Sequence, residues 1–259
     1  MATTPDSPAE LLNATAELTI AGQKVRLEMP IPAGPARLAE LLPVFRSMTD
    51  ASVEVSVANA RAEGLAVSCK KGCGACCRQL VPVAEIEARR LWEVVEAMPE
   101  PRRSTVRARF EAARQRLAAA GLLEKLREPR QFQDEDVIPF GMDYFRQGIA
   151  CPFLEEESCS IYAERPMACR EYLVVTPAEH CATPTVESVS CVKLVLRTAR
   201  TIRGLNAEHS EYAQPWVALI LALEWTEAHP DGSSPQPGPA WVREVFGRLT
   251  GRAVPEAAP

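Results

Sequence analysis

The sequence lacks the segments that would place the protein in a membrane or direct it out of the cell. It has no uninterrupted run of about eighteen apolar residues, the length that a membrane-spanning helix needs, and residues 216–223 come closest. Residues 1–14 contain no basic region followed by an apolar run, the pattern of a secretory signal. We therefore expect a soluble, cytoplasmic protein without membrane contact.

The sequence also lacks the motifs of several common enzyme classes. It contains no GxGxxG dinucleotide fingerprint, no GxxxxGKS/T phosphate loop, no HExxH pair and no GxSxG nucleophile elbow. Its formal net charge of -5 argues against a generally basic nucleic-acid-binding surface. Nucleic acid is therefore not expected as a partner.

Cysteine, by contrast, is abundant, with nine residues in a chain of 259. Disulfides are rare in the cytoplasm, so clustered cysteines there are typical of metal ligands or redox thiols. Four of the nine occur in the segment Cys69-Lys-Lys-Gly-Cys73-Gly-Ala-Cys76-Cys77. The residues between them are small or charged, and glycine leaves the backbone free to turn around an ion. This composition indicates a metal knuckle rather than a packed core.

A second set of cysteines lies much further along the chain. It occurs in Cys151-Pro-Phe-Leu, Cys159-Ser-Ile-Tyr, Arg165-Pro-Met-Ala-Cys169-Arg-Glu-Tyr and His180-Cys181. With the first four, these thiols form two groups of four. The predicted metal ligands are Cys69, Cys73, Cys76, Cys77, Cys151, Cys159, Cys169 and Cys181.

The order of these motifs, CxxxCxxCC, then CPFL, then CxIYxxRPxxCRxY, resembles the YkgJ-like cysteine-cluster family over about residues 69–181. That family is described as zinc- or iron-chelating, so the resemblance implies a metal site. Some relatives are flagellin lysine methylases, a class associated with an iron–sulfur cluster and S-adenosylmethionine. The resemblance implies a metal centre more directly than it implies a reaction.

Thiolates are soft ligands, which suit zinc and iron–sulfur clusters rather than calcium or magnesium. A structural zinc site takes closely spaced cysteine pairs, and Cys69 with Cys73, or Cys73 with Cys76, would serve as one pair. A four-iron cluster is likewise held by four thiolates. The side chains of Cys76 and Cys77 are expected to diverge, which indicates two neighbouring centres or one multinuclear cluster. We expect an iron–sulfur cluster of the 4Fe–4S kind ahead of zinc, and the pairing of the thiols stays open.

Several charged residues could act on these thiols. Lys70, Lys71 and Arg78 lie beside the first four cysteines and would favour their thiolate forms. Arg165 or Arg170 could donate to sulfur or pair with the acidic run at 155–157, and a purely structural ion pair explains them equally well.

Four residues with side chains that can bind metals are interpreted differently. Cys191 falls within an expected helix among apolar residues, so we interpret it as a packing residue whose replacement by serine leaves metal content unchanged. His180 could replace a thiolate in a zinc site, but we interpret it as an exposed loop residue. His209 and His229 lie among polar residues and are expected at the surface.

Two classes of function stay open. One is an enzyme, a cluster-dependent protein methyltransferase with a protein substrate; the other is a zinc-stabilised interaction or metal-handling module with a protein partner. An enzyme should keep an open coordination position and a pocket, whereas a structural site is closed. No motif supports S-adenosylmethionine beyond the CxxxCxxC spacing of Cys69, Cys73 and Cys76. That spacing is typical of radical enzymes built on an α/β barrel, and this chain shows no repeated strand–helix units.

The apolar pattern predicts a mainly α-helical fold with a small N-terminal β-hairpin and an irregular, cysteine-rich centre at 151–181. The hairpin is expected over residues 18–29, around a turn at 21–23. Helices are expected over residues 38–48, 52–63, 82–98, 104–121, 134–147, 186–203, 216–223 and 242–249. The helix at 104–121 and the residues before it carry six arginines between positions 102 and 116. We interpret this basic face as solvated surface, with docking of an anionic partner as the alternative.

The domain boundaries follow from composition. We expect a loose tail over 1–14 and one cysteine-cluster domain over 15–228, with its metal-binding core at 69–181. A proline- and glycine-rich linker should follow over 229–240, and a C-terminal helix and tail over 241–259.

Overall fold

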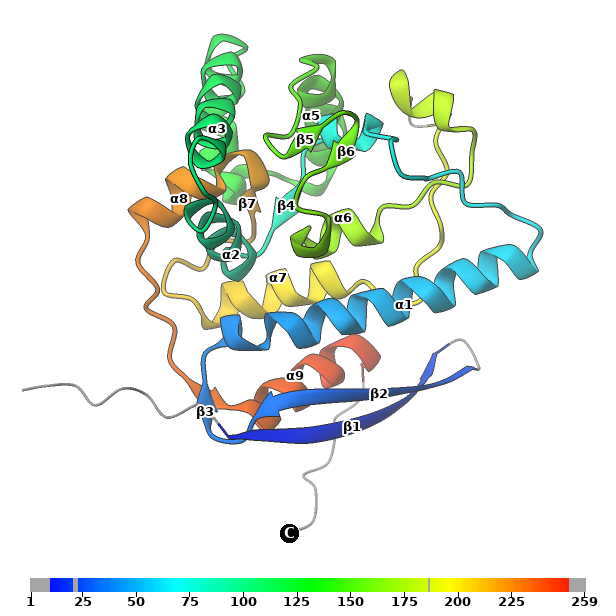
Figure 1. The fold of residues 1–259 in the computed structure, drawn as a ribbon. Coiled ribbons are helices and arrows are strands. Elements are labelled where there is room, and N and C mark those ends of the chain that lie inside the picture. The colour runs from blue at the N-terminus through cyan, green and yellow to red at the C-terminus, as the bar shows by residue number, and fades with distance from the viewer. Residues whose placement is uncertain (1–9, 21–22, 186, 252–259) are drawn as a thin grey trace, which may run out of the picture.

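The structure is a computed structural model that describes residues 10–20, 23–185 and 187–251. It is mainly α-helical, as the sequence predicts, and its strands are short apart from those of the N-terminal hairpin (Figure 1). The strands are β1 (Leu11–Ile20), β2 (Gln23–Pro32), β3 (Pro35–Ala36), β4 (Pro82–Val83), β5 (Leu154–Glu155), β6 (Ser158–Cys159), β7 (Val217–Ala218) and β8 (Gln236–Pro237). Within the described residues, no helix combines the length and apolarity needed to span a bilayer.

The helices alternate with short 3-10 turns. The α-helices are α1 (Leu42–Ala62), α2 (Glu85–Glu96), α3 (Arg102–Ala119), α4 (Leu123–Arg127), α5 (Asp134–Arg146), α6 (Met167–Glu171), α7 (Thr198–His209), α8 (Ala222–Ala228) and α9 (Gly238–Thr250). The 3-10 turns are η1 (Leu38–Leu41), η2 (Ala75–Arg78), η3 (Pro129–Gln131), η4 (Tyr162–Glu164), η5 (Ala178–Ala182) and η6 (Leu219–Leu221).

The predicted hairpin is confirmed, and it is longer than expected. β1 pairs antiparallel with β2 from Leu11 opposite Pro32 to Ile20 opposite Gln23. Residues 11–14, expected as part of a loose tail, are therefore paired strand, while residues 1–9 and the turn residues 21–22 lie outside the described part of the chain. Met29 and Ile31 alternate along β2 and are both buried, so this face of the hairpin packs on the core.

The first core joins the hairpin to three helices. The long helix α1 crosses the middle of the molecule, with α7 beside it and α9 between it and the hairpin (Figure 1). Their buried side chains form one apolar cluster with β2, in which Phe45 of α1 and Ile202 of α7 are fully buried. This layer is the platform on which the rest of the chain lies.

The C-terminal helix belongs to this core. The linker expected before it, over 229–240, is shorter than predicted and pairs with β3 through β8. β8 pairs with β3, and α9 begins at Gly238, earlier than position 241. Trp241 is buried and its Nε1 donates to the carbonyl oxygen of Ala36 at 2.8 Å. A Cβ at position 238 would lie 2.1 Å from the carbonyl oxygen of Pro32, so glycine permits this close approach.

Two further apolar clusters lie above the platform. One joins α2, α3 and α8 to Phe153 and Ile161 of the cysteine-rich region, and the other joins α3, α4 and α5. The buried side of α3 consists of Val106, Phe110, Ala113 and Leu117, the residues that the helical period predicts. The cysteine-rich region is thus anchored at one end in a helical core.

The predicted helix over 186–203 is wrong in its first half. α7 begins only at Thr198, and the described residues from 187 to 197 are not helical. Their backbone bonds elsewhere: the Val195 amide donates to Ser56 Oγ at 3.0 Å, and Ser52 Oγ donates to the Leu196 carbonyl at 3.3 Å. Because serines of α1 satisfy these backbone groups, the segment stays extended despite its apolar period.

Candidate metal centre

Three segments distant in sequence lie side by side at the cysteine-rich region. In Figure 1 they are the cyan chain that leads to β4, the green β5–β6 hairpin and the yellow-green chain that follows α6. The Cys151 amide donates to the Cys77 carbonyl at 2.7 Å, and the Ser68 amide donates to the Val174 carbonyl at 2.9 Å. Backbone hydrogen bonds therefore hold the first four cysteines to both later segments.

The first four cysteines lie on a tight turn followed by η2. Gly72 has φ 84°, a left-handed conformation that favours glycine. The Cys73 amide donates to the Lys70 carbonyl and the Cys77 amide to the Gly74 carbonyl, at 3.1 and 3.0 Å. Cys69, Cys73, Cys76 and Cys77 are all half-buried and free of disulfides.

Cys76 and Cys77 are neighbours on η2, and the divergence predicted for their side chains stays a prediction. A hydrogen bond between their two thiols is the main cause that raises the pKa of Cys76, followed by burial. Both residues lie within the short 3-10 turn η2, which brings successive side chains closer than an extended chain does. The two thiols are therefore close enough to affect each other's ionisation.

A salt bridge between Arg78 and Glu157 fixes η2 against the β5–β6 hairpin. Arg78 donates to both carboxylate oxygens of Glu157, at 2.7 and 3.1 Å, and to the Gly74 carbonyl at 2.9 Å. A Cβ at Gly74 would lie 2.5 Å from Glu157 Oε2 and 2.8 Å from Leu154 Cδ1. Glycine at this position lets the two segments touch.

The hairpin itself carries Cys159 and is joined to Cys151. Leu154 pairs with Cys159, and the Leu154 amide donates to the Cys151 carbonyl at 2.9 Å. The connecting residues Glu156 and Glu157 have φ of 48° and 55°, an arrangement uncommon for residues other than glycine. This tight turn places Cys159, on β6, beside the segment that begins at Cys151 and leads into β5.

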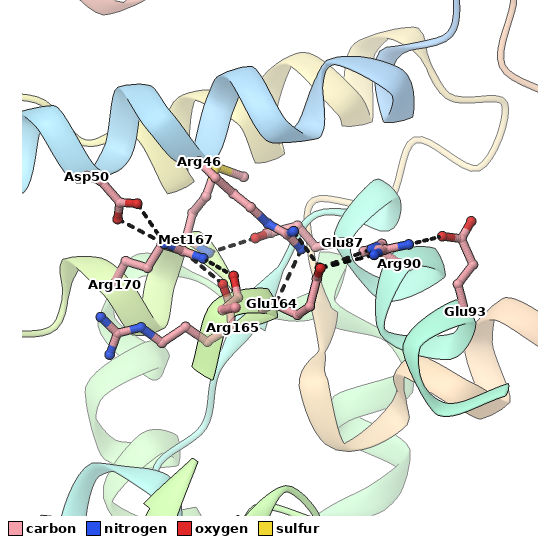
Figure 2. Close-up of polar contacts among 10 residues, drawn as sticks. Arg46, Asp50, Glu87, Arg90, Glu93, Glu164, Arg165, Met167 and Arg170 are labelled. Atoms are coloured by element: carbon pink, nitrogen blue, oxygen red, sulfur yellow. Dashed lines mark hydrogen bonds and ion pairs between the residues drawn. The ribbon is translucent and has the colours of Figure 1, made fainter. Parts of the chain in front are cut away.

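The RPxxCR motif is held from behind by α1 and α2 (Figure 2). Arg170, whose side chain is 10% exposed, donates to Asp50 of α1 at 2.8 and 3.0 Å and to the carbonyls of Arg165 and Ala163. Arg170 is thus a structural residue and does not pair with the acidic run at 155–157. That run is instead bound by arginines of α3 and by Arg78.

Glu164 lies between two further arginines. It accepts from Arg46 of α1 at 2.5 Å and from Arg90 of α2 at 3.0 Å (Figure 2). Hydrogen bonds from Arg90 and Arg46, with their positive charge, lower the pKa of Glu164 to about 2. These contacts tie the start of the motif to both helices.

Glu87 links the helices α2 and α6 from a fully buried position. Its side chain accepts from the Ala84 amide at 3.0 Å, before α2, and from the Met167 amide at 2.8 Å, at the start of α6. A single carboxylate therefore serves two helix N-termini, whose amides need acceptors. Burial raises the pKa of Glu87, and these two amides and Arg203 oppose that effect. Because α6 carries Cys169, Glu87 positions that thiol.

Arg165 faces away from these contacts and towards the thiols. In Figure 2 its side chain extends to the other side of the motif from Asp50 and Glu164. Its Cζ lies 4.1 Å from the centre of the Tyr162 ring, and its Nε is buried without a hydrogen-bond partner among the described residues. Its charge lowers the pKa of Cys69 and Cys159, against the larger effect of burial.

The segment after α6 brings two more cysteines to the region. η5, which contains the buried Cys181, contacts η2. Cys191 pairs with Val174 in an isolated β-bridge and is exposed. The interpretation of Cys191 as a helical packing residue is therefore wrong, because the backbone there bonds to residues 173–175 instead of forming a helix.

The histidines take no part in this arrangement. His180 is exposed, as expected, and its Nδ1 lies 2.9 Å from the Ser188 carbonyl. His209 lies beside Glu244 and the Trp241 ring, and His229 stacks on Trp225. The candidate donors of this region are therefore its cysteines.

The thiols are held in a state that disfavours free thiolates. Burial raises the pKa of Cys151 to about 12 and raises that of Cys159 and Cys169. Neighbouring cysteines add to the effect of burial, because each thiolate repels the next. A bound cation would supply the missing positive charge and allow several thiolates to coexist.

The donor set fits a zinc or iron–sulfur group in its chemistry. All nine thiols are free, and the unpartnered Arg165 Nε beside them can donate to a thiolate or sulfide. Among the described residues, no three cysteine, histidine or acidic side chains already surround one point at metal-binding distance.

A small cavity adjoins the thiols. It is lined by Cys77, Cys151 and Tyr144 together with aliphatic side chains, and its volume is about 10 Å³. Burial raises the pKa of Tyr144, and Cys151 adds to that shift. No sequence motif marked Tyr144, since only the fold brings α5 against these cysteines. A second cavity of about 20 Å³ lies elsewhere, beside Glu85 and His209.

The predicted basic face of α3 is a network of ion pairs rather than a free positive surface. Arg102 and Arg109 lie 4.0 and 3.0 Å from Glu155, Arg107 contacts Glu96 and Glu227, Arg114 contacts Glu111 and Glu224, Arg103 contacts Glu100, and Arg116 donates to the Gln147 carbonyl. These carboxylates come largely from α2, α8 and the β5–β6 hairpin. The positive charge of these arginines is thus mostly balanced by glutamates of the same molecule.

Comparison with models of known protein families gives a match. The family model CxxCxxCC, described as a "putative zinc- or iron-chelating domain", matches residues 68–191. No curated protein and no solved structure matches the chain. The matched segment begins just before Cys69, ends at Cys191 and contains every cysteine of the sequence. The match over residues 68–191 confirms the resemblance to this cysteine-cluster family that the motifs predict.

Proposed function

We propose that this protein holds a thiolate-ligated metal centre, with an iron–sulfur cluster ahead of zinc as the bound group. The proposed ligands are Cys69, Cys73, Cys76, Cys77, Cys151, Cys159, Cys169 and Cys181. The observation that supports this most is the backbone bonding of the first four cysteines to both later segments, without any disulfide. Free thiols gathered from distant segments are typical of a metal site.

Two features favour an iron–sulfur cluster. The candidate donors are thiols, with His180 bonded elsewhere, and Cys76 and Cys77 lie next to each other on one turn. A cluster with several metal atoms can accept adjacent thiolates more readily than one small ion can. When bound, such a group supplies positive charge and a centre that can change oxidation state.

The chain's own residues would support such a group in three ways. Val174 donates its amide to Cys69 Sγ at 3.3 Å, and amide donors to sulfur tune a thiolate centre. Arg165 places positive charge beside the thiols. The hydrogen bonds from Arg170 to Asp50 fix the helix that carries Cys169. Metal binding would close the long connection between Cys77 and Cys151 and so contribute to folding.

Of the two classes of function, a metal-handling or interaction module is better supported than a methyltransferase. The cavity beside Cys77 and Cys151 measures about 10 Å³, which is room for roughly one water molecule. A cofactor of the size of S-adenosylmethionine needs a much larger pocket. We therefore propose a centre that stabilises this fold and presents its surface, or its metal, to a protein partner.

The test is anaerobic purification followed by elemental analysis and an absorption spectrum of the same sample. Iron with acid-labile sulfide and broad absorption near about 400 nm, where thiolate-ligated clusters absorb, is the expected result. If the protein were colourless and contained stoichiometric zinc, the bound group would be zinc rather than a cluster, and the proposed ligands would stay the same. Folded protein that contains neither metal, and binds neither on reconstitution, would overturn the proposal.

A further inference from the structure

We propose that Cys191 is a ninth thiol of the metal centre, and that it forms one four-thiol group with Cys69, Cys73 and Cys181. This inference rests on the proposed metal centre and extends it, because neither the motif spacing nor a helical reading of residues 186–203 includes Cys191. Each thiol that ligates loses its proton to solvent as its sulfur bonds to the metal.

The geometry around Val174 places Cys191 at the centre. The Val175 amide donates to the Ser190 carbonyl and the Val192 amide to the Leu173 carbonyl, at 2.9 and 2.8 Å. Val174 and Cys191 thus face each other as a pair without direct hydrogen bonds, in which the two side chains lie on one face and close together. The other edge of Val174 bonds to Cys69, whose Sγ accepts the Val174 amide at 3.3 Å. One residue therefore separates the backbones that carry Cys69 and Cys191.

Tyr172 connects the same thiol to the first knuckle. Its hydroxyl accepts from Gln79 Nε2, just after η2, at 2.9 Å. The same hydroxyl hydrogen-bonds to the thiol of Cys191. Tyr172 therefore bridges the end of η2 and Cys191.

Cys181 completes the group from a third side. It lies in η5, which packs on η2. η2 carries Cys76 and Cys77 and directly follows the turn that carries Cys69 and Cys73. This contact therefore places Cys181 beside the first four cysteines.

The remaining cysteines form a second group by the same criteria. Cys151 bonds to the Cys77 backbone and lines one cavity with it, while Cys159 lies on the strand opposite Leu154. Cys169 lies on α6, which contacts β4, the strand that follows η2. We assign Cys77, Cys151, Cys159 and Cys169 to the second group. Cys76 adjoins both groups, because η2 contacts η5, which carries Cys181, and its neighbour Cys77 bonds to Cys151.

The test is a set of serine variants reconstituted anaerobically with the metal that the unmodified protein carries. Cys191→Ser is expected to lose about half of the bound metal, as the loss of one of two four-thiolate sites requires. Cys69→Ser/Cys191→Ser should lose no more, because both residues serve one group. Cys159→Ser/Cys191→Ser should lose nearly all of it. Ser190→Ala, beside Cys191 in the same segment, is the matched control and should keep full metal content.

Alkylation of the unmodified protein gives a readout that does not depend on the folding of variants. Iodoacetamide labelling mapped by mass spectrometry should find Cys191 protected in the metal-loaded protein and reactive after metal removal. Full metal content in folded Cys191→Ser, or equal labelling of Cys191 with and without metal, would overturn the assignment while leaving the eight-ligand centre intact. Absence of metal from the unmodified protein would instead overturn the proposed centre itself.

Discussion

The buried carboxylate of Glu87 offers a sharp test of how the scaffold positions the metal centre. It accepts from two backbone amides, those of Ala84 and Met167, and its residue is 2% exposed. Glu87→Gln keeps the shape of the side chain but offers a single acceptor oxygen. One buried amide then loses its partner, which costs about 2 kcal/mol. Glu87→Ala removes both acceptors and leaves a cavity, and we expect about 4 kcal/mol.

The assay is urea unfolding of the metal-loaded protein, followed by far-ultraviolet circular dichroism. A lower midpoint at unchanged slope would report a loss of stability without a change in the surface exposed on unfolding. Metal content should fall together with stability, because the Met167 amide begins the helix that carries Cys169.

Glu93→Gln is the matched control for this prediction. Glu93 lies on the same helix, its side chain is 56% exposed and it pairs with Arg90 at 3.0 Å, so its replacement should change stability by less than about 0.5 kcal/mol. If Glu87→Gln were no more destabilising than Glu93→Gln, Glu87 would not be the helix anchor described above.

Three further predictions follow from the same contacts. Gly74→Ala should destabilise the protein by about 2 kcal/mol in urea unfolding, because the added Cβ overpacks against Glu157; an unchanged midpoint would contradict that contact. The pKa of Glu164 is about 2 against an ordinary value of 4.5, so its contribution to stability is complete above pH 4.5 and is lost as the pH falls towards 2. The difference in unfolding free energy between Glu164→Gln and the unmodified protein should therefore become smaller as the pH falls from 4.5 to 2. A difference that does not depend on pH would refute the lowered pKa. Cys76→Ser and Cys169→Ser should each lower both metal content by elemental analysis and thermal stability, and full retention of both by either variant would exclude that residue as a ligand.

The sequence was sufficient for the features that depend on local pattern. The spacing of the eight cysteines predicts the family, and the helical period predicts the buried side of α3 from Val106 to Leu117. In the same way, alternation around residues 21–23 predicts the N-terminal hairpin. Each of these signals lies within a few residues of the feature that it predicts.

The features that depend on tertiary pairing could not be found in this way. The apolar residues from 189 to 196 fit a helical period, but serines of α1 and residues 173–175 bind their backbone and keep it extended. Cys191 was excluded on the strength of that helix. The arginines of α3 likewise looked like free surface, since their acidic partners lie on elements distant in sequence. Tyr144 and Glu87 belong to no sequence motif. They lie near the cysteines only because α5 and α2 pack there in the folded chain.

X-ray absorption spectroscopy at the metal edge of the anaerobically purified protein tests the central claim most directly. A centre held by these cysteines predicts a first coordination shell made of sulfur alone, at about 2.3 Å as in thiolate sites, with a further metal–metal distance if the group is an iron–sulfur cluster. A first shell that contained mainly nitrogen or oxygen at about 2.0–2.2 Å would contradict the account, because the ligands that it proposes are all free cysteines.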